Sequence, residues 1–288
     1  MKISNSCIIC GNIKIFKRSA ILMPFIADRV FGWTPFFLEK NFNIRTIKMG
    51  IVYSNVNSCY CKLCHLIYLD MRFDEDELKK LYKDYRGVKY NELRIKYEPE
   101  YKEMDNYIKN IYSIENRKKT EEYLSEHLDN FSEILDWGGG DGGNTPFFGD
   151  KKINIDIFDI SGNKIKEKIN IRFINKVEKQ YDLITALHVF EHVPYPLSLL
   201  NEIGRALKLD GYIYIEVPFE NIMRNVIDPI NEKNHWHEHI NFYSLQSLEI
   251  MLSKSKSKFK IINISTQDIS DNFRNCHIIR VLAKKGYK

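Results

Sequence analysis

The 288-residue sequence has no apolar run that approaches the roughly 18 residues of a membrane-spanning helix. Its first residues also lack the apolar core of a secretory signal peptide. There is no internal repeat, and the only low-complexity stretch is the Lys/Ser run at 254–260, which is typical of a solvated loop or helix end. These absences exclude membrane-spanning and repeat proteins, and we expect a cytoplasmic protein.

A large excess of one charge is also missing. Lys and Arg total 43 against 38 Asp and Glu, which gives a net charge of +5. Because the sequence shows no clear basic stripe, a nucleic-acid partner is disfavoured. Hydrophobic residues make up 44% of the chain, as in globular proteins, and its length suffices for one large core or two unequal domains.

Two C-x-x-C pairs stand near the start of the chain. Cys7 and Cys10 belong to "CIICGN", and Cys61 and Cys64 belong to "CKLCHL". Two such pairs supply the four thiolates of a tetrahedral structural zinc site, although their separation of about fifty residues is longer than usual. Cys59 could replace Cys61, and free core cysteines or a disulfide are the alternatives. We expect one zinc ion bound by Cys7, Cys10, Cys61 and Cys64.

The segment between the two pairs, 15–58, is rich in apolar and aromatic residues, as in "ILMPFIADRVFGWTPFF". A small zinc module does not need so much apolar surface, so the segment either packs on the rest of the protein as core or forms part of a lid over a substrate pocket. Residues 71–129 are charged and mostly helical in pattern. We therefore divide the chain into a zinc module at 1–70, connecting helices at 71–129 and a second domain at 130–288.

Apolar strand-like runs alternate with helical segments from residue 131 onward. A strand that ends at Asp136 is followed by runs at 153–159, 171–174, 181–187, 212–217, 259–265 and 276–283, and a helix is expected at 196–208. This alternation predicts an α/β fold with a doubly wound, seven-stranded, mostly parallel sheet. Ligands of such sheets bind beyond the carboxyl ends of the strands.

A glycine-rich turn follows the first of these strands. Gly138, Gly140 and Gly142 form D-x-G-x-G-x-G with Asp136, and glycines allow the backbone to approach a ligand closely. Asp159 ends the next strand, where an acid accepts hydrogen bonds from ribose hydroxyls. These two features by themselves leave a dinucleotide-dependent dehydrogenase open.

The rest of the chain favours a different enzyme class. The motifs "ILDWGGGDGG", "FDIS", "YDLITALHVFEHVPYP", "EIGRALKLDGYIYIEVP" and "HEHINFYSLQSLEIML" follow one another over 133–252. In this order the sequence resembles the class I S-adenosylmethionine-dependent methyltransferases. The paired cysteines extend the resemblance to a bacterial branch with an N-terminal zinc-binding segment, which often acts on sugars or other metabolites.

The resemblance implies a binding site for S-adenosylmethionine. The three glycines would wrap the methionine part of the cofactor, and Asp136 would hold the turn or the amino group. Asp159 would bind the ribose, and two residues after the fourth strand would lie along the cofactor. The cofactor-binding residues implied in this way are Asp136, Gly138, Gly140, Gly142, Asp159, Leu187 and His188.

Three histidines alternate in "HWHEHINFYS", where His235, His237 and His239 surround Glu238. Such a group can bind a metal, supply a base with its helper, or form a polar surface loop. Similar sugar C-methyltransferases have a Glu-His pair of the acceptor site here, which Glu238 and His239 match. Because a histidine has a pKa suited to remove a proton, we expect His239 to be the general base and Glu238 to orient the acceptor or a neighbouring base. His192 of "FEHV" is the alternative base or a partner, and it stays open that neither histidine is the base and that His192 only fixes its loop.

We therefore expect an S-adenosylmethionine-dependent methyltransferase that acts on a small polar acceptor, a sugar or a nucleotide-sugar. Two alternatives stay open, namely a methyltransferase of RNA or protein and a binding module that kept the fold without catalysis. The glycine turn, Asp159 and the Glu238–His239 pair disfavour the inactive module.

Overall fold

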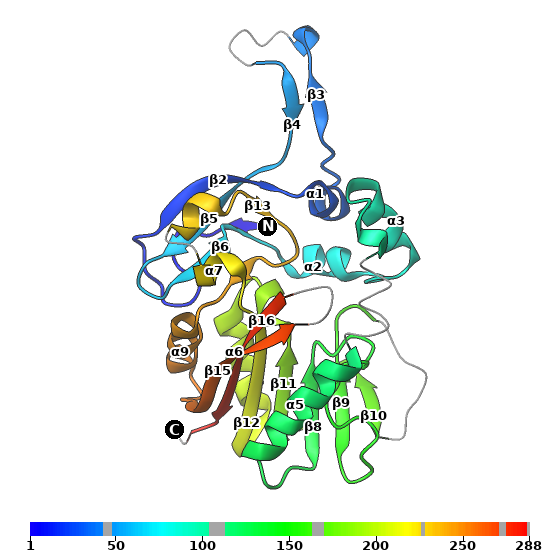
Figure 1. Cartoon of the computed structure of the whole chain (residues 1–288), viewed down its shortest axis with the longest axis vertical. Helices are drawn as coiled ribbons and strands as arrows, with labels where there is room; N and C mark the ends of the chain where they lie inside the picture. Colours follow the sequence, from blue (N-terminus) through cyan, green and yellow to red (C-terminus); the bar gives the residue numbers. More distant parts are fainter. Residues whose placement is uncertain (43–47, 104–112, 163–169, 226–227, 271–274, 287–288) are drawn as a thin grey trace.

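The computed structural model describes residues 1–42, 48–103, 113–162, 170–225, 228–270 and 275–286. Its larger sheet has seven strands in the order β10-β9-β8-β11-β12-β16-β15 (Figure 1). The first five strands in this order are parallel, and β16 runs antiparallel to both β12 and β15. The strands are β8 (Glu133–Trp137), β9 (Asn154–Phe158), β10 (Ile171–Ile174), β11 (Tyr181–Leu187), β12 (Leu207–Pro218), β15 (Lys260–Ser270) and β16 (Asn275–Lys284). The α/β fold predicted from the sequence is confirmed.

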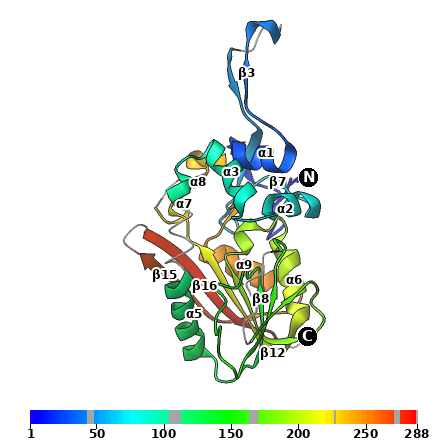
Figure 2. The same ribbon diagram turned by 90° about the vertical axis from the view of Figure 1, so that its right-hand side faces the viewer.

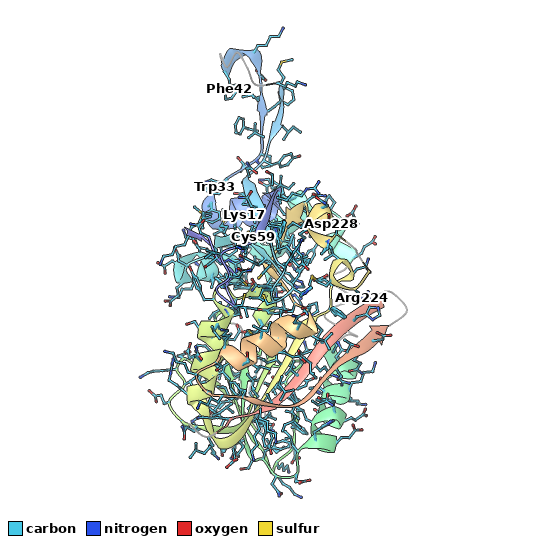
Figure 3. The ribbon with its side chains drawn as sticks, turned by 90° about the vertical axis from the view of Figure 1, so that its left-hand side faces the viewer. Lys17, Trp33, Phe42, Cys59, Arg224 and Asp228 are labelled. Carbon is cyan, nitrogen blue, oxygen red and sulfur yellow. The ribbon has the colours of Figure 1, made fainter. Side chains whose placement is uncertain are left out.

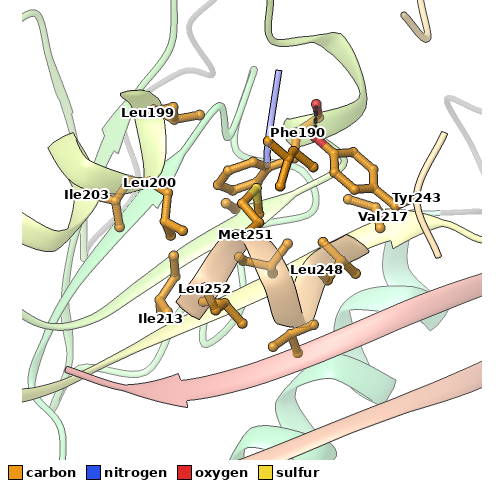
Figure 4. Close-up of a cluster of buried hydrophobic side chains, with 14 of the residues drawn as sticks. Phe190, Leu199, Leu200, Ile203, Ile213, Val217, Tyr243, Leu248, Met251 and Leu252 are labelled. Carbon is orange, nitrogen blue, oxygen red and sulfur yellow. Dashed lines mark hydrogen bonds between the residues drawn. The ribbon is translucent and has the colours of Figure 1, made fainter. Parts of the chain in front are cut away.

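Helices cover both faces of this sheet (Figure 2). On one face, α5 (Ser113–His127) packs Tyr123 and Leu124 against the strands. On the other face, α6 (Pro196–Ala206) and α9 (Leu245–Lys254) share an apolar core with β12 (Figure 4). The leucines and isoleucines of α6 face this core because they recur at the spacing of one helical side, and Pro196 occupies the first turn, where its missing N–H costs nothing.

The connections at the β10 edge of the sheet are unusual for this architecture. Residues 138–153, between β8 and β9, form turns without a helix, and so do residues 175–180, between β10 and β11. Pro146 and Gly149, whose φ is +92°, explain the first case because both residues disfavour a continuous helix. The chain that follows the glycine turn is therefore built from loops.

A second, five-stranded sheet has the order β13-β2-β5-β6-β14. The N-terminal part supplies β2 (Phe16–Leu22), β5 (Asn55–Cys61) and β6 (Leu66–Leu69), while β13 (His235–Trp236) and β14 (Asn241–Phe242) come from the histidine segment. The fully buried Trp236 donates its indole N–H to Ser58 Oγ at 2.8 Å. The histidine segment is thus part of the N-terminal sheet, and the domain boundaries at 70 and 129 stay a prediction.

Three helices pack on this second sheet. They are α1 (Pro24–Phe31), α2 (Glu75–Tyr82) and α3 (Val88–Tyr97), and they share one apolar cluster with Trp236. The helical pattern of 71–129 is confirmed for α2, α3 and α5, while its part at 104–112 lies outside the described residues. The smaller elements are β1 (Lys2–Ile3), β7 (Met71–Arg72), η3 (Phe190–His192), α7 (Asn221–Asn225) and α8 (Pro229–Glu232).

The apolar segment 15–58 divides into two parts. Its first half supplies β2 and the buried face of α1. Its second half forms an antiparallel hairpin of β3 (Phe36–Leu38) and β4 (Gly50–Val52), with the turn η1 (Lys40–Phe42) beyond β3. This hairpin, which we call the arm (residues 33–42 and 48–53), projects away from the body of the molecule (Figures 1 and 3). It therefore forms neither core nor a lid over this chain's own sheet.

Candidate active site

The glycine turn leaves the carboxyl end of β8 in a conformation that requires glycine. Gly138, Gly140 and Gly142 have φ of +75°, +57° and +84°, which L side chains rarely adopt. A Cβ on Gly138 would also lie 2.6 Å from Cγ2 of Val189. The turn therefore presents bare backbone at the carboxyl edge of the sheet, as a bound nucleoside cofactor requires.

Asp159 follows β9 and faces this turn. Its Oδ2 accepts a hydrogen bond from the N–H of Gly140 at 2.9 Å, and its Oδ1 accepts one from the N–H of Ser161 at 2.7 Å. The side chain is half-buried. Since each carboxylate oxygen can accept more than one hydrogen bond, Asp159 can fix the turn and still receive a ribose hydroxyl.

Asp136 is buried beneath the turn. Its Oδ2 accepts from the Thr145 hydroxyl at 2.5 Å and its Oδ1 from the Thr185 hydroxyl at 2.8 Å. Burial raises the pKa of this carboxyl to about 6, although the two hydroxyls lower it. Of the two roles we expected, these contacts fit holding the turn, because they join its far end to β11.

Leu187 and His188 end β11 next to two acidic side chains. The N–H of His188 donates to the Glu216 carbonyl at 2.9 Å, and its ring nitrogens lie 3.3 Å from Glu191 Oε1 and 3.2 Å from Glu216 Oε1. Both glutamates are buried, and the sequence alone did not single out Glu216. Nearby histidines lower the pKa of Glu191 although burial opposes this, so the group is a carboxylate surrounded by imidazoles.

His192 and His239 meet near the carboxyl edge of the larger sheet. Their ring centroids are 4.8 Å apart, and Nδ1–H of His192 donates to the Glu238 carbonyl at 3.0 Å. Nδ1–H of His239 donates to Glu220 Oε1 at 2.9 Å. Because both Nδ1 atoms carry protons in these bonds, the Nε2 lone pairs of the neutral rings remain available.

The two histidines have opposite pKa shifts. Burial lowers the pKa of His192 to about 4. Burial also lowers that of His239, but the hydrogen bond to Glu220 and the charges of Glu191 and Glu238 outweigh it, so its pKa lies above the ordinary histidine value. Of the pair, His239 is therefore the stronger proton acceptor. Glu220, two residues after β12, was missed by the sequence reasoning, although its place at the carboxyl edge is a signal.

The Glu238 carboxylate is directed toward polar side chains of α3. The Tyr90 hydroxyl donates to Glu238 Oε1, and Arg94 Nη1 donates to Oε2 at 3.1 Å. His237 Nδ1 lies 3.7 Å away, and its Nε2 contacts Glu98 Oε1 at 2.6 Å. Glu238 thus anchors the histidine segment to α3, and its backbone carbonyl holds His192.

The three alternating histidines do not converge on one point. His237 contacts Glu98 and His239 contacts Glu220, while His235 lies at the start of β13. Among the described residues, His239 instead belongs to a group with Glu191 and His192, whose possible ligand atoms lie within 4.8 Å of one another. A metal site built from all three alternating histidines is therefore not formed.

The two cysteine pairs converge as expected. Cys7 Sγ is 3.4 Å from Cys64 Sγ, Cys10 Sγ is 3.5 Å from Cys61 Sγ, and all four lie within 4.8 Å of one another. Four soft sulfur donors at this spacing fit a tetrahedral zinc ion. Cys59 is buried in the neighbouring core and is not part of this group, so the geometry favours Cys61 over Cys59 as the fourth ligand.

The chain is similar to known proteins over the larger sheet. Residues 110–255 match the family model described as methyltransferase domain, and this is half of the chain. The chain therefore belongs to the methyltransferase-domain family and is an S-adenosylmethionine-dependent methyltransferase. No curated protein matches the sequence. Among the described residues, no helix is long and apolar enough to cross a membrane.

The similar solved structures share little sequence identity with this chain. The 1,6-didemethyltoxoflavin-N1-methyltransferase of Burkholderia thailandensis is 16% identical, with 62% of this chain and 82% of that chain covered and a TM-score of 0.47. The plantazolicin methyltransferase is 17% identical, with 64% and 90% covered and a TM-score of 0.47. The magnesium protoporphyrin IX methyltransferase of Synechocystis is 12% identical, with 60% and 83% covered and a TM-score of 0.44.

Proposed function

We propose that the protein methylates a small polar acceptor, a sugar or a nucleotide-sugar, with His239 as the general base. The observation that carries this proposal is the Glu220–His239 pair beside His192 at the carboxyl edge of the sheet. S-adenosylmethionine supplies a methyl group on an already activated sulfonium sulfur. The protein must therefore bind the donor, align the acceptor and remove one proton.

The donor side is assigned to the glycine turn and Asp159. The turn leaves room for the methionine part of the cofactor, and Asp159 receives the ribose hydroxyls while its bond to Gly140 keeps the turn in place. Leu187 and His188 line the same edge at the end of β11. Asp136 supports the turn from below through Thr145 and Thr185.

The acceptor side is assigned to the two histidines. His192, kept neutral by a pKa of about 4, receives a hydrogen bond from an acceptor hydroxyl at Nε2 and thereby orients it. His239 takes the proton at Nε2, and Glu220 stabilises the imidazolium that forms. Glu238 is a positioning residue, because its carboxylate is held by α3 and its carbonyl by His192.

The size of the acceptor is inferred from what covers this side. Tyr82, at the end of α2, contacts the His192 ring edge-to-face with centroids 5.8 Å apart, and α3 reaches the same segment through Arg94. Because α2 and α3 pack so close to His192 and the histidine segment, a small molecule is favoured over a folded macromolecule as the acceptor. The modest net charge of +5 also supports this choice over RNA.

The cysteine group is assigned to one structural zinc ion. All four ligands come from the protein, which leaves no open position for catalysis. The ion would join the loop at 7–10 to the turn between β5 and β6, and so would support the sheet to which β13 and β14 belong.

Calorimetric titration with S-adenosylhomocysteine tests the donor site without any acceptor. We expect Asp159→Ala to weaken binding at least about tenfold, because two hydrogen bonds to the ribose and the bond to Gly140 are lost. His239→Asn is the matched control and should bind as the unaltered protein does. Tighter binding of NAD than of S-adenosylhomocysteine would contradict the assignment.

A further inference from the structure

The carboxylate of Glu191 is buried beside the two histidines of the proposed acceptor site and lacks a hydrogen-bond donor. Glu191 is 1% exposed, and no described residue donates a hydrogen bond to its Oε1 or Oε2. Its Oε1 lies 3.3 Å from Nδ1 of His188 and 3.9 Å from Nε2 of His192. A buried carboxylate of this kind is costly unless a positive charge compensates it.

The turn η3, which carries Glu191, is fixed against the histidine segment. The N–H of Ile240 donates to the Glu191 carbonyl at 2.8 Å. A side-chain oxygen of Glu191 and one ring nitrogen each of His192 and His239 lie within 4.8 Å of one another. Since the side chain of His239 is 37% exposed, a covered carboxylate lies next to an accessible base.

Two more carboxylates border the same histidines. Glu216 Oε1 lies 3.2 Å from Nε2 of His188, so this imidazole bridges Glu216 and Glu191. Glu220 holds His239 through Oε1, and no described residue donates to its Oε2. The side chain of Glu220 is 29% exposed, so a ligand at His239 can contact this carboxylate directly.

Few cations balance these carboxylates. Among the described residues, none of the three glutamates forms an ion pair with a lysine or an arginine. The neighbouring cations Lys233 and Arg280 lie instead over the rings of Trp236 and Tyr123. His188 remains, and a single imidazolium can neutralise only one carboxylate. The acceptor atom therefore enters an electric field that favours positive charge.

The sign of this field distinguishes the possible nucleophiles. An alcohol oxygen or an enolate carbon becomes negative as its proton leaves, and nearby carboxylates oppose that charge. An amine nitrogen becomes positive as it attacks the methyl group, and the same carboxylates stabilise it. The donor sulfonium is present with either kind of acceptor, so it does not change this comparison.

We propose that the acceptor is an amino sugar and that the methylated atom is its amine nitrogen. The protonated amine binds beside Glu220 and near Glu191, and His239 removes one proton from it. The nitrogen lone pair then forms the bond to the methyl carbon, while the carbon–sulfur bond breaks and its electron pair stays on sulfur. The products are S-adenosylhomocysteine and a protonated methylamine, and His239 releases its proton to solvent. This inference rests on the proposed function, because it assigns the acceptor class of the same site.

The acceptor preference of the unaltered, zinc-loaded protein tests this proposal. Release of S-adenosylhomocysteine is measured with UDP- and dTDP-linked hexoses that carry one amine at each ring carbon in turn, and the glucose compounds are the hydroxyl counterparts. We expect kcat/KM for one amine to exceed that for its counterpart at least about 100-fold, with the methyl group on nitrogen by mass spectrometry. Equal or preferential methylation of the hydroxyl compounds would overturn the amine and leave the sugar acceptor standing. Turnover of none of these sugars would overturn both.

Glu191→Gln separates the effect of the charge from a structural role. Loss of the charge should lower kcat/KM for the amine at least about tenfold, while the slower turnover of the hydroxyl counterpart falls less. Damage to the fold would instead lower both equally. Glu202→Gln, an exposed glutamate of α6, is the matched control and should keep the full preference, and both variants should still bind S-adenosylhomocysteine. An unchanged preference in Glu191→Gln would contradict the role of this carboxylate, and if the variant does not fold, the acceptor panel with the unaltered protein decides.

Discussion

Glu238 is a buried carboxylate whose ionised form the surrounding residues stabilise. Burial alone would raise its pKa, but the charges of His237 and Arg94 and the Tyr90 hydroxyl lower it to about 2. The folded-state pKa is therefore below that of the unfolded chain. A group of this kind contributes stability that is present above the ordinary glutamate pKa and is lost as the pH falls toward 2.

Replacing this carboxylate should therefore have a pH-dependent cost. We expect Glu238→Gln to lower the free energy of unfolding by about 3 kcal/mol at pH 7, since the largely buried Arg94 loses one of its two carboxylate partners and keeps only Glu98. The difference from the unaltered protein should shrink as the pH is lowered from about 5. Urea unfolding at several pH values measures it, with the exposed Glu249→Gln as a control that changes little. An equal loss at pH 7 and pH 4 would show that the ionised form is not what matters.

At the scale of elements, the histidine segment joins the two sheets. It leaves β12 at the carboxyl edge of the larger sheet and then pairs with β2 and β6 of the smaller one. Anything that loosens the smaller sheet should therefore move His239. The proposed zinc ion holds the turn between β5 and β6, next to β14.

We predict that the protein contains zinc and that its removal impairs catalysis. Elemental analysis should give one zinc per chain, Cys61→Ser should lose it, and Cys59→Ser, a neighbouring buried cysteine, should keep it. Removal of zinc should lower the turnover number while the affinity for S-adenosylhomocysteine changes little, because the glycine turn lies in the other sheet. Loss of zinc from the Cys59 variant, or a folded and fully active zinc-free protein, would contradict this account.

The histidine segment shows what the sequence could not predict. The apolar runs of the larger sheet specify strands because each is long enough to show its pattern, and β11 occupies the predicted 181–187. By contrast, β13 and β14 have two residues each, and no periodicity can appear in so short a stretch. Their pairing with strands more than 170 residues earlier is a consequence of tertiary packing.

The site residues also differ in whether the sequence alone could identify them. The glycine turn and Asp159 could be identified because their chemistry is local to two consecutive strand ends. Arg94 could not, because it acquires its role through Glu238, which is distant in sequence. Glu220 was missed although its place two residues after β12 was a signal, because its partner His239 lies on another element. The arm was visible as an apolar segment, but its direction away from the body depends on where α1 ends.

At the scale of the whole molecule, the proposed donor site belongs to the larger sheet. In the proposed acceptor site, α2 contributes Tyr82 beside His192, and α3 holds the histidine segment through Arg94. The arm extends away from the smaller sheet and from the larger sheet below it (Figure 1).

The pH dependence of turnover tests the central claim, that His239 removes the acceptor proton. The rate of S-adenosylhomocysteine release is measured with the best acceptor from a panel of nucleotide-sugars. Since the base acts in its neutral form and its pKa is raised, the rate should rise with pH through a value above the ordinary histidine pKa and then level off. Glu220→Gln should move this rise to lower pH, because the hydrogen-bonded carboxylate is lost.

His239→Asn should lower the turnover number by about 100-fold or more, abolish the rise with pH and leave the affinity for S-adenosylhomocysteine unchanged. His235→Ala, on the same segment but without contact to the pair, is the control and should retain the full profile. A His239 variant that keeps both its rate and its pH dependence would contradict the account.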